Sequence, residues 1–239
     1  MTKETKEAVQ QEVEHYLRTG DHDETYTAFP GHTIFQRAKG IDHVLREALV
    51  AEVRKREKGR HPPSVPEGTD VVCLARDKAT PMVRGLFPDG EREAILRVLE
   101  SSVVFLTCDN IGDVLAGTTW HSTAWDLANL YLGSIGARRL GAEGSCLVGL
   151  SEETTCYVSQ AYFDETDPFA DFVVHEMAHV FHNWKRESVG LPHTRYREWL
   201  LQIDFRKRET FAYACEAYSR IRERAGSGME RSRLLSQYA

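Results

Sequence analysis

One segment, DFVVHEMAHVFHN (residues 171–183), most constrains how this chain folds. It places two histidines four positions apart among hydrophobic residues, so a helix through it carries both imidazoles on one face, about one turn apart. Hydrophobic side chains on both flanks predict that this helix is buried, which requires other layers of structure to cover it. We expect the helix to run from about Pro168 to Trp184.

The segments around this helix predict a mixed architecture. Strands are expected at Val71–Asp77, Cys146–Leu150 and Thr154–Phe163, the last two joined as a hairpin. Asp89 and Ser122 are expected helix N-caps. This order of helices, a strand pair and further helices predicts an α+β fold. Helical periodicity runs through residues 3–17, 41–58, 89–101, 122–135 and 205–224.

A proline-rich segment, HPPSVPEGTD (residues 61–70), divides the chain. Its three prolines and one glycine interrupt any helix, which is typical of a linker or a long loop. We therefore expect an N-terminal helical region in residues 1–66 and a second domain in residues 67–239. Neither part contains an internal repeat.

The composition excludes several classes of protein. A chain of 239 residues with 41% hydrophobic and 28% charged residues is of ordinary globular type. Its beginning lacks the apolar core of a signal peptide, and no apolar run approaches the roughly 18 residues that span a bilayer, so we expect a cytoplasmic protein without membrane contact. Five scattered cysteines fit a reducing compartment. Arginines in the C-terminal quarter alternate with glutamates, so nucleic acid is not an expected partner.

The spacing of His175 and His179 suits the binding of one metal ion. Neutral imidazole nitrogens are good zinc ligands, and Glu176 beside them can act as the general base towards a water in an HExxH site. A catalytic zinc site needs a third protein ligand and keeps one position open. Glu209, thirty residues after His179, is the predicted third ligand, and Glu216 on the same helix face competes with it.

The sequence HEMAH followed by ETFAYA resembles the gluzincin branch of the zincin metallopeptidases. The resemblance covers about 45 residues, from His175 to Arg220, and does not extend to residues 1–66. It implies a zincin-like domain with one zinc ion per chain, metallopeptidase activity, and a peptide or protein substrate. It also implies that Thr154–Phe163 is an edge strand that pairs with an extended substrate. The metzincin pattern fails, because Lys185 stands where its third histidine would be.

Several polar residues are candidates for supporting roles. Tyr213, His193 and Tyr196 are candidate donors to the oxyanion that forms in amide hydrolysis, and the sequence does not choose among them. His182 and Asn183, one turn beyond His179, either orient metal ligands or are ordinary polar residues at a helix end.

Two alternatives remain open at this point. EGSCLVGLSEE (residues 143–153) is similar to a segment of peptide deformylases in which a cysteine is the third metal ligand. That interpretation makes Cys146 a ligand, although Ser145 interrupts the phrase and a small buried cysteine in a strand is the simpler explanation. The other alternative is a non-catalytic binding protein on a zincin scaffold, which recognises a partner through its N-terminal helices.

Overall fold

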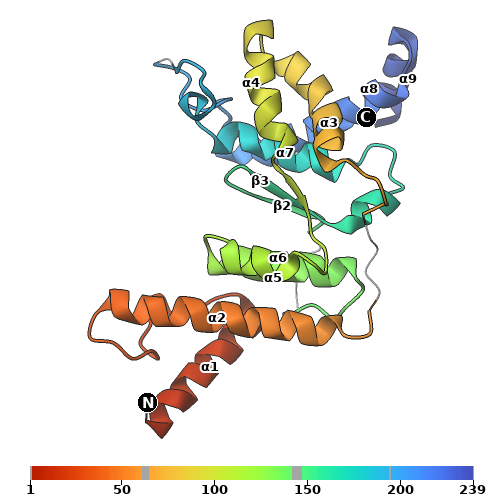
Figure 1. Cartoon of the computed structure of the whole chain (residues 1–239). Coiled ribbons are helices and arrows are strands. Elements are labelled where there is room, and N and C mark those ends of the chain that lie inside the picture. Colours follow the sequence, from red (N-terminus) through yellow and green to blue (C-terminus); the bar gives the residue numbers. More distant parts are fainter. Residues whose placement is uncertain (1, 61–64, 142–146, 194, 239) are drawn as a thin grey trace. The chain divides into compact units, whose positions relative to one another are not determined.

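The computed structural model of the chain describes residues 2–60, 65–141, 147–193 and 195–238. It divides into two compact units: unit 1 comprises Met1–Pro63 and Leu106–Leu147, and unit 2 comprises Ser64–Phe105 and Val148–Ala239. Helices and one small sheet make up the described elements, which confirms the expected α+β class (Figure 1). None of the helices that the structure describes is long and apolar enough to cross a membrane.

Unit 1 is helical. Thr2 and Thr33 cap its first two helices, because the side-chain oxygen of each accepts a hydrogen bond from the backbone N–H three residues later. The guanidinium of Arg46 is buried and donates to the carbonyl of Leu115 and the hydroxyl of Thr118, each at 2.8 Å. The described helices are α1 (Lys3–Thr19), α2 (Ile34–Glu57), α5 (Ile111–Gly117) and α6 (His121–Ser134).

Unit 1 contains residues that the sequence analysis assigned to the second domain. The segment Leu106–Leu147 groups with the N-terminal helices rather than with unit 2. Leu127 and Leu130 of α6 are buried, and the hydroxyl of the buried Tyr131 donates to a carboxylate oxygen of Glu57 in α2 at 2.8 Å. The chain passes between the units near residues 63, 105 and 147, and the proline-rich segment marks only the first of these places.

Unit 2 combines a three-stranded sheet with the helices that pack on it. The helix α7 covers one face of the sheet (Figure 1), and its buried side chains Val173, Met177 and Phe181 belong to the same hydrophobic core as Cys156 and Val158 of the central strand. The described elements are α3 (Val71–Leu86), α4 (Asp89–Glu100), β1 (Val103–Phe105), β2 (Gly149–Glu152), β3 (Thr155–Val158), α7 (Phe172–Asn183), α8 (Arg208–Arg224) and α9 (Gly228–Tyr238), with short 3₁₀ helices at Gln160–Asp164, Arg186–Val189 and Phe205–Lys207.

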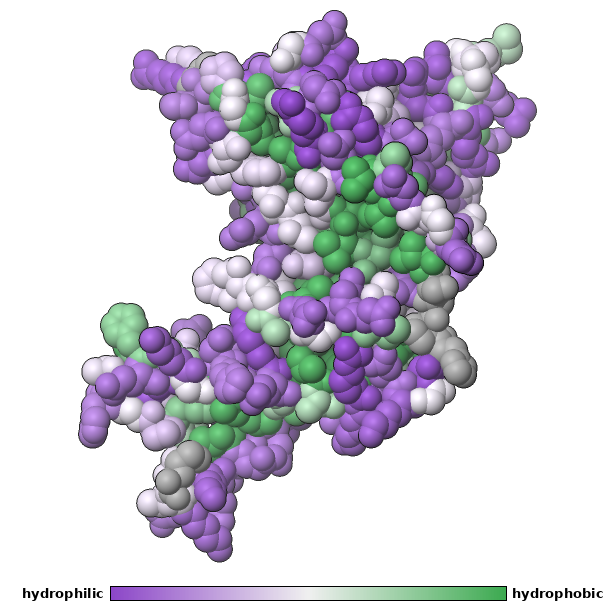
Figure 2. Space-filling view, viewed as in Figure 1, coloured by the Kyte–Doolittle hydropathy of each residue, from purple (hydrophilic) through white to green (hydrophobic). Residues whose placement is uncertain are grey.

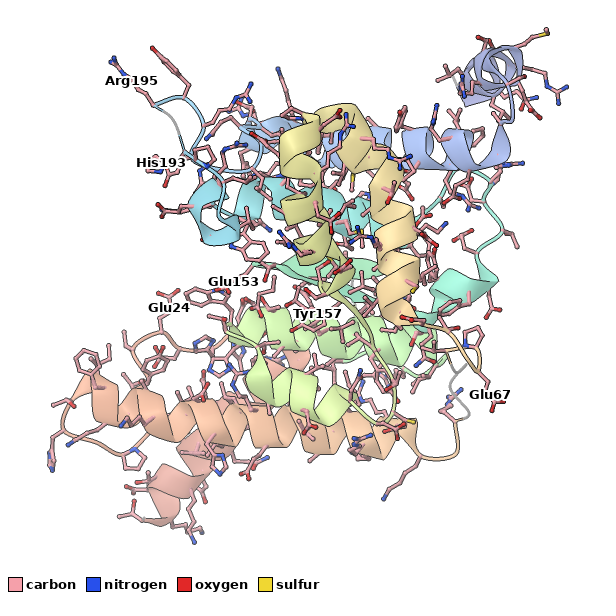
Figure 3. The ribbon with its side chains drawn as sticks, turned by 45° about the horizontal axis from the view of Figure 1, so that its top comes forward. Glu24, Glu67, Glu153, Tyr157, His193 and Arg195 are labelled. Atoms are coloured by element: carbon pink, nitrogen blue, oxygen red, sulfur yellow. The ribbon has the colours of Figure 1, made fainter. Side chains whose placement is uncertain are left out.

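The expected hairpin is present, but its place in the sheet differs from the prediction. β2 and β3 pair antiparallel around a turn at Glu153, where φ is 51° (Figure 3), and β1 pairs parallel on the other side of β3. The strand order is therefore β1-β3-β2. The expectation that Thr154–Phe163 is an edge strand is wrong, because β3 has a partner on both sides. β2 has one strand partner in the described part of the chain.

Three local expectations are corrected. Val71–Asp77 is not a strand but the start of α3, because the Asp70 side chain accepts from the N–H of Cys73 and the buried positions follow helical spacing as far as Val83. The helices α4 and α6 begin at Asp89 and His121, so neither Asp89 nor Ser122 is the N-cap residue. The short elements β1, α5 and α9 were not predicted.

The surface seen in Figure 2 is hydrophilic over most of its area, with hydrophobic residues grouped near the middle of the view and others standing singly. Among the large hydrophobic residues that are exposed, Phe35 lies at the beginning of α2, Trp120 precedes α6, and Met229 lies at the beginning of α9. Scattered exposed hydrophobic residues are normal in folded proteins and indicate no site by themselves.

Candidate metal centre

The helix α7 begins at Phe172 because Asp171 caps it. The Asp171 side chain accepts a hydrogen bond from the N–H of Val174 at 3.2 Å, which satisfies one of the free donors of the first turn. With the helix fixed in this register, His175 and His179 lie on one face and their ring centroids are 5.2 Å apart. This confirms the predicted placement of the two imidazoles.

The helix α8 brings Glu209 to the same face. The two carboxylate oxygens of Glu209 lie 3.5 Å from the Nε2 atom of His175 and 3.5 Å from the Nε2 atom of His179. One potential ligand atom from each of the three residues lies within 4.8 Å of the others. The Glu209 side chain is 69% exposed, so this group opens to solvent on the side of Glu209.

Glu216 meets His175 from the opposite side of the ring. One of its oxygens lies 3.2 Å from Nδ1 of His175, and the other accepts from the backbone N–H of Asp171 at 2.5 Å. A carboxylate accepts, so Nδ1 of His175 carries a proton, and Nε2 is the ring nitrogen that has a lone pair for a metal when the ring is neutral. Glu216, the competing ligand of the sequence analysis, therefore holds the candidate ligand His175 in place through the other ring nitrogen.

His182 lies against the second histidine. Its Nε2 atom is 3.2 Å from Nδ1 of His179, so one of these atoms donates to the other. When Nε2 of His179 is the free acceptor, Nδ1 of His179 is the donor and Nε2 of His182 accepts. Burial, reinforced by Arg208 and His179, lowers the pKa of His182 to about 4, so this ring is neutral near pH 7. His182 therefore contacts the candidate ligand His179 through a ring nitrogen.

The charges around His175 and His179 act in opposite directions. Burial lowers the pKa of His175, but the hydrogen bond to Glu216 and the nearby carboxylates of Glu176 and Glu209 outweigh it, and the net pKa is raised. Burial lowers the pKa of His179, and Glu209 only partly offsets this. The carboxylates therefore favour a positive charge on His175, whereas burial and neighbouring positive groups disfavour one on His179.

Glu176 is buried next to the group. Its exposed fraction is 6%, and burial raises the pKa of its carboxyl to about 7. The positive His175 and a hydrogen bond from the Ser151 side chain lower the pKa, whereas Glu209 and Glu216 raise it. A carboxyl group with a pKa near neutrality is suited to accept and return a proton.

Glu176 packs against β2. A Cβ atom built on Gly149 would lie 2.6 Å from both Cγ and Oε1 of Glu176, and the Ser151 side chain hydrogen-bonds to the same side chain. Gly149 and Ser151 are two positions apart on the strand and so face the same side of the sheet. This face of β2 forms one wall around the carboxylate.

The backbone of β2 is open at the same two residues. Antiparallel strands alternate hydrogen-bonded and non-hydrogen-bonded pairs, and the N–H of Ser159 donates to the carbonyl of Val148 at 2.9 Å. Val148 and Ser159 are therefore a hydrogen-bonded pair, and so is Leu150 with Tyr157, two residues further along β2. The residues between, Gly149 and Ser151, belong to the non-hydrogen-bonded pairs, so their N–H and C=O groups point away from β3. They lie along the side of β2 that has no strand partner among the described residues.

The other predicted residues are dispersed. The ring of Tyr213 lies edge-on to His175 with centroids 4.6 Å apart, and Tyr213 is 56% exposed. Figure 3 shows His193 on the loop that follows α7, where it contacts Glu187 at 3.8 Å instead of the metal-ligand candidates. Tyr196 lies farther along this loop, beneath the guanidinium of Arg195. Cys146, the alternative ligand, lies outside the described residues.

The donor set of His175, His179 and Glu209 fits a zinc ion. Two imidazole nitrogens and one carboxylate are the ligands of a common class of catalytic zinc site, which leaves a fourth position open. The carboxylate of Glu216 on His175 is the arrangement that fixes the ring and strengthens a metal-binding imidazole. The exposure of Glu209 leaves the group accessible from solvent.

Sequence reasoning missed three residues around this group. Asp171 precedes a hydrophobic run, and this N-cap signal was available in the sequence. Gly149 and Ser151 carry no such signal, because a glycine and a serine in a short strand are ordinary. Their relation to Glu176 depends on how α7 packs on the sheet.

Comparison of this chain with protein-family models, with curated proteins and with solved structures found no match.

Proposed function

We propose that this chain is a zinc-dependent metallopeptidase whose unit 2 is a zincin-like domain. The observation that carries the proposal is the convergence of His175, His179 and Glu209, with ligand atoms within 4.8 Å of one another, beside the buried carboxyl of Glu176. The resemblance of HEMAH and ETFAYA to the gluzincins supports the same reading.

In this proposal three residues bind the ion and two others orient the imidazoles. Nε2 of His175, Nε2 of His179 and the Glu209 carboxylate would hold it, while Glu216 and His182 keep the two rings oriented through their Nδ1 atoms. A zinc ion bound there supplies a Lewis acid that lowers the pKa of a water and polarises a carbonyl oxygen.

Glu176 handles the proton in this proposal. Its carboxylate takes a proton from the attacking water and passes it to the amine that leaves, so one side chain serves as base and then as acid. Burial raises the pKa of this carboxyl, which strengthens it as a proton acceptor. Tyr213, whose ring lies edge-on to His175, is the predicted oxyanion donor that contacts a proposed ligand.

The open edge of β2 suits an extended peptide. The main-chain groups of Gly149 and Ser151 that point away from β3 can pair with the main chain of a substrate as an added strand would. This replaces the strand at Thr154–Phe163 as the predicted substrate edge.

The experiment measures zinc content and peptide hydrolysis in matched glutamate variants. Wild-type protein should contain about one zinc per chain and cleave casein or a peptide library. Glu176→Gln should keep the zinc and lose about 10²–10⁴-fold in turnover. Glu209→Gln should lose zinc and hydrolysis together. Glu47→Gln on α2 is the control, because its side chain is 67% exposed, close to the 69% of Glu209.

Two results would overturn the proposal. Wild-type cleavage by Glu176→Gln would exclude the assigned base. Zinc bound without any hydrolysis across the library would favour the alternative of a non-catalytic binding protein.

A further inference from the structure

We propose that Gly149 and Ser151 are positioning residues for Glu176: the glycine leaves the space that its carboxylate occupies, and the serine hydroxyl holds the carboxylate there. The inference rests on the proposed function, because it concerns the residue assigned as the base. It adds a role for β2 beyond that of a substrate edge.

The glycine at 149 is explained by space rather than by backbone conformation. The φ angle of Gly149 is not positive, and Gly149 pairs with Val158 in the regular ladder of the sheet. Other residues could therefore adopt its backbone conformation. A Cβ there would lie 2.6 Å from Cγ and Oε1 of Glu176 and 2.9 Å from Cδ. These separations are shorter than any normal carbon contact of about 3.5 Å. A glycine weakens a strand, so its presence here is best explained by the close approach of Glu176.

The serine supplies a directional restraint. A glutamate side chain rotates about three bonds, and burial alone does not select the orientation of its carboxylate. The Ser151 side chain lies on the same face of β2 as the Gly149–Glu176 contact, and its interaction with the carboxylate lowers the pKa of Glu176. A buried carboxylate without such a partner would carry an uncompensated desolvation cost.

The same two residues present open main-chain groups to a substrate. Gly149 and Ser151 belong to the non-hydrogen-bonded pairs of the β2–β3 ladder, so their N–H and C=O groups point to the open side. A peptide paired there is bound by the residues whose side-chain positions contact Glu176. The position of the base is thereby tied to the position of the substrate main chain.

The first test is a thermal cycle on metal-free protein, which needs no substrate. Gly149→Ala should lower the melting temperature of the wild type by several degrees, about 3–10 °C, because the new methyl group overlaps Glu176. In a Glu176→Ala background the same change should have an effect of about 1 °C or less. Gly90→Ala on α4 is the control, since a Cβ there meets no atom within 4 Å. An equal loss in both backgrounds would overturn the proposal.

The second test separates positioning from general stability. Ser151→Ala should lower kcat for peptide hydrolysis about tenfold with KM and zinc content unchanged, since a restraint on the base is lost and no ligand is removed. Ser151→Thr, which keeps the hydroxyl, should restore kcat. An unchanged kcat in Ser151→Ala would overturn the role of the serine. A wild type that hydrolyses nothing would overturn the proposed function and the positioning role together, whereas the thermal cycle separately decides the contact between Gly149 and Glu176.

Discussion

Oε2 of Glu216 lies 3.2 Å from Nδ1 of His175, while Nε2 of the same ring faces Glu209. The carboxylates of Glu209 and Glu216, both on α8, thus lie against opposite nitrogens of the His175 ring. Seven positions separate them, which is two helical turns, so one helix delivers both. A candidate metal ligand and the group that orients another ligand are therefore fixed by the same element.

Glu216→Gln should weaken zinc binding without abolishing it. The amide retains the size of the side chain but loses the charge that strengthens and orients His175, and loss of such partners typically costs about 10–100-fold in metal affinity. Chelator competition measures the dissociation constant. Glu230→Gln on α9 should leave the affinity unchanged. An unchanged affinity in Glu216→Gln would exclude the orienting role.

Glu209→Ala should remove far more zinc than Cys146→Ser. The glutamate offers its oxygens to both imidazoles at 3.5 Å, so its loss leaves two ligands, which is too few for a stable zinc site. Zinc content after dialysis and cobalt absorption spectra would rank the two variants. The opposite ranking would support the deformylase-like reading instead.

Asp171→Ala should destabilise unit 2 by about 2–4 kcal/mol. The change removes the N-cap of α7 and takes one of two carboxylates from Lys78, whose ammonium lies 2.8 Å from Asp171 and 2.8 Å from Glu223. Asp171→Asn keeps a capping oxygen and should cost less. Urea denaturation of both variants gives the comparison, and equal losses would show that the cap contributes little.

Because of His121, the free energy of unfolding of unit 1 should decrease as the pH becomes acidic. Burial, with Arg46 and His22, lowers the pKa of His121 from its ordinary value of 6.5 to about 4. The folded state then binds fewer protons than the unfolded state, so stability present above about pH 6.5 is lost as the pH falls towards 4. The full effect of such a shift is about 3 kcal/mol.

Replacement of His121 by glutamine should remove this dependence. Urea denaturation at pH 7 and pH 4.5 should show a smaller loss of stability for His121→Gln than for the wild type. His43→Gln on α2, where the side chain is 74% exposed, should behave like the wild type. An identical pH dependence for all three proteins would exclude His121 as the source.

The sequence predicts the helix α7 and the placement of its two histidines on one face because these signals are local. The spacing of His175 and His179 and the hydrophobic flanks depend only on helical periodicity. The start of α3 was misassigned because a short window around Val71 contains β-branched residues, whereas the helical burial pattern appears only when the window extends to Val83.

The parts of the site that were not predicted depend on contacts between distant segments. β3 is central because β1, a three-residue strand with little pattern of its own, pairs with it. The crowding of Gly149 against Glu176 arises only once the hairpin meets α7. The segment Leu106–Leu147, which contains α6 and Tyr131, also belongs to unit 1, and no change in amino-acid composition marks where this segment begins.

The route of the chain between the units sets an order for its assembly. The sheet pairs Val103 with Cys156, and the residues between them include a segment of unit 1. During synthesis from the N-terminus, both segments of unit 1 emerge before the hairpin that completes the sheet. Unit 1 can therefore fold on the ribosome before β3 has been synthesised and has paired with β1. The helix α7 can pack on the complete sheet only after that pairing. Closing this long loop is entropically costly, which makes formation of the sheet the expected slow step in building the site.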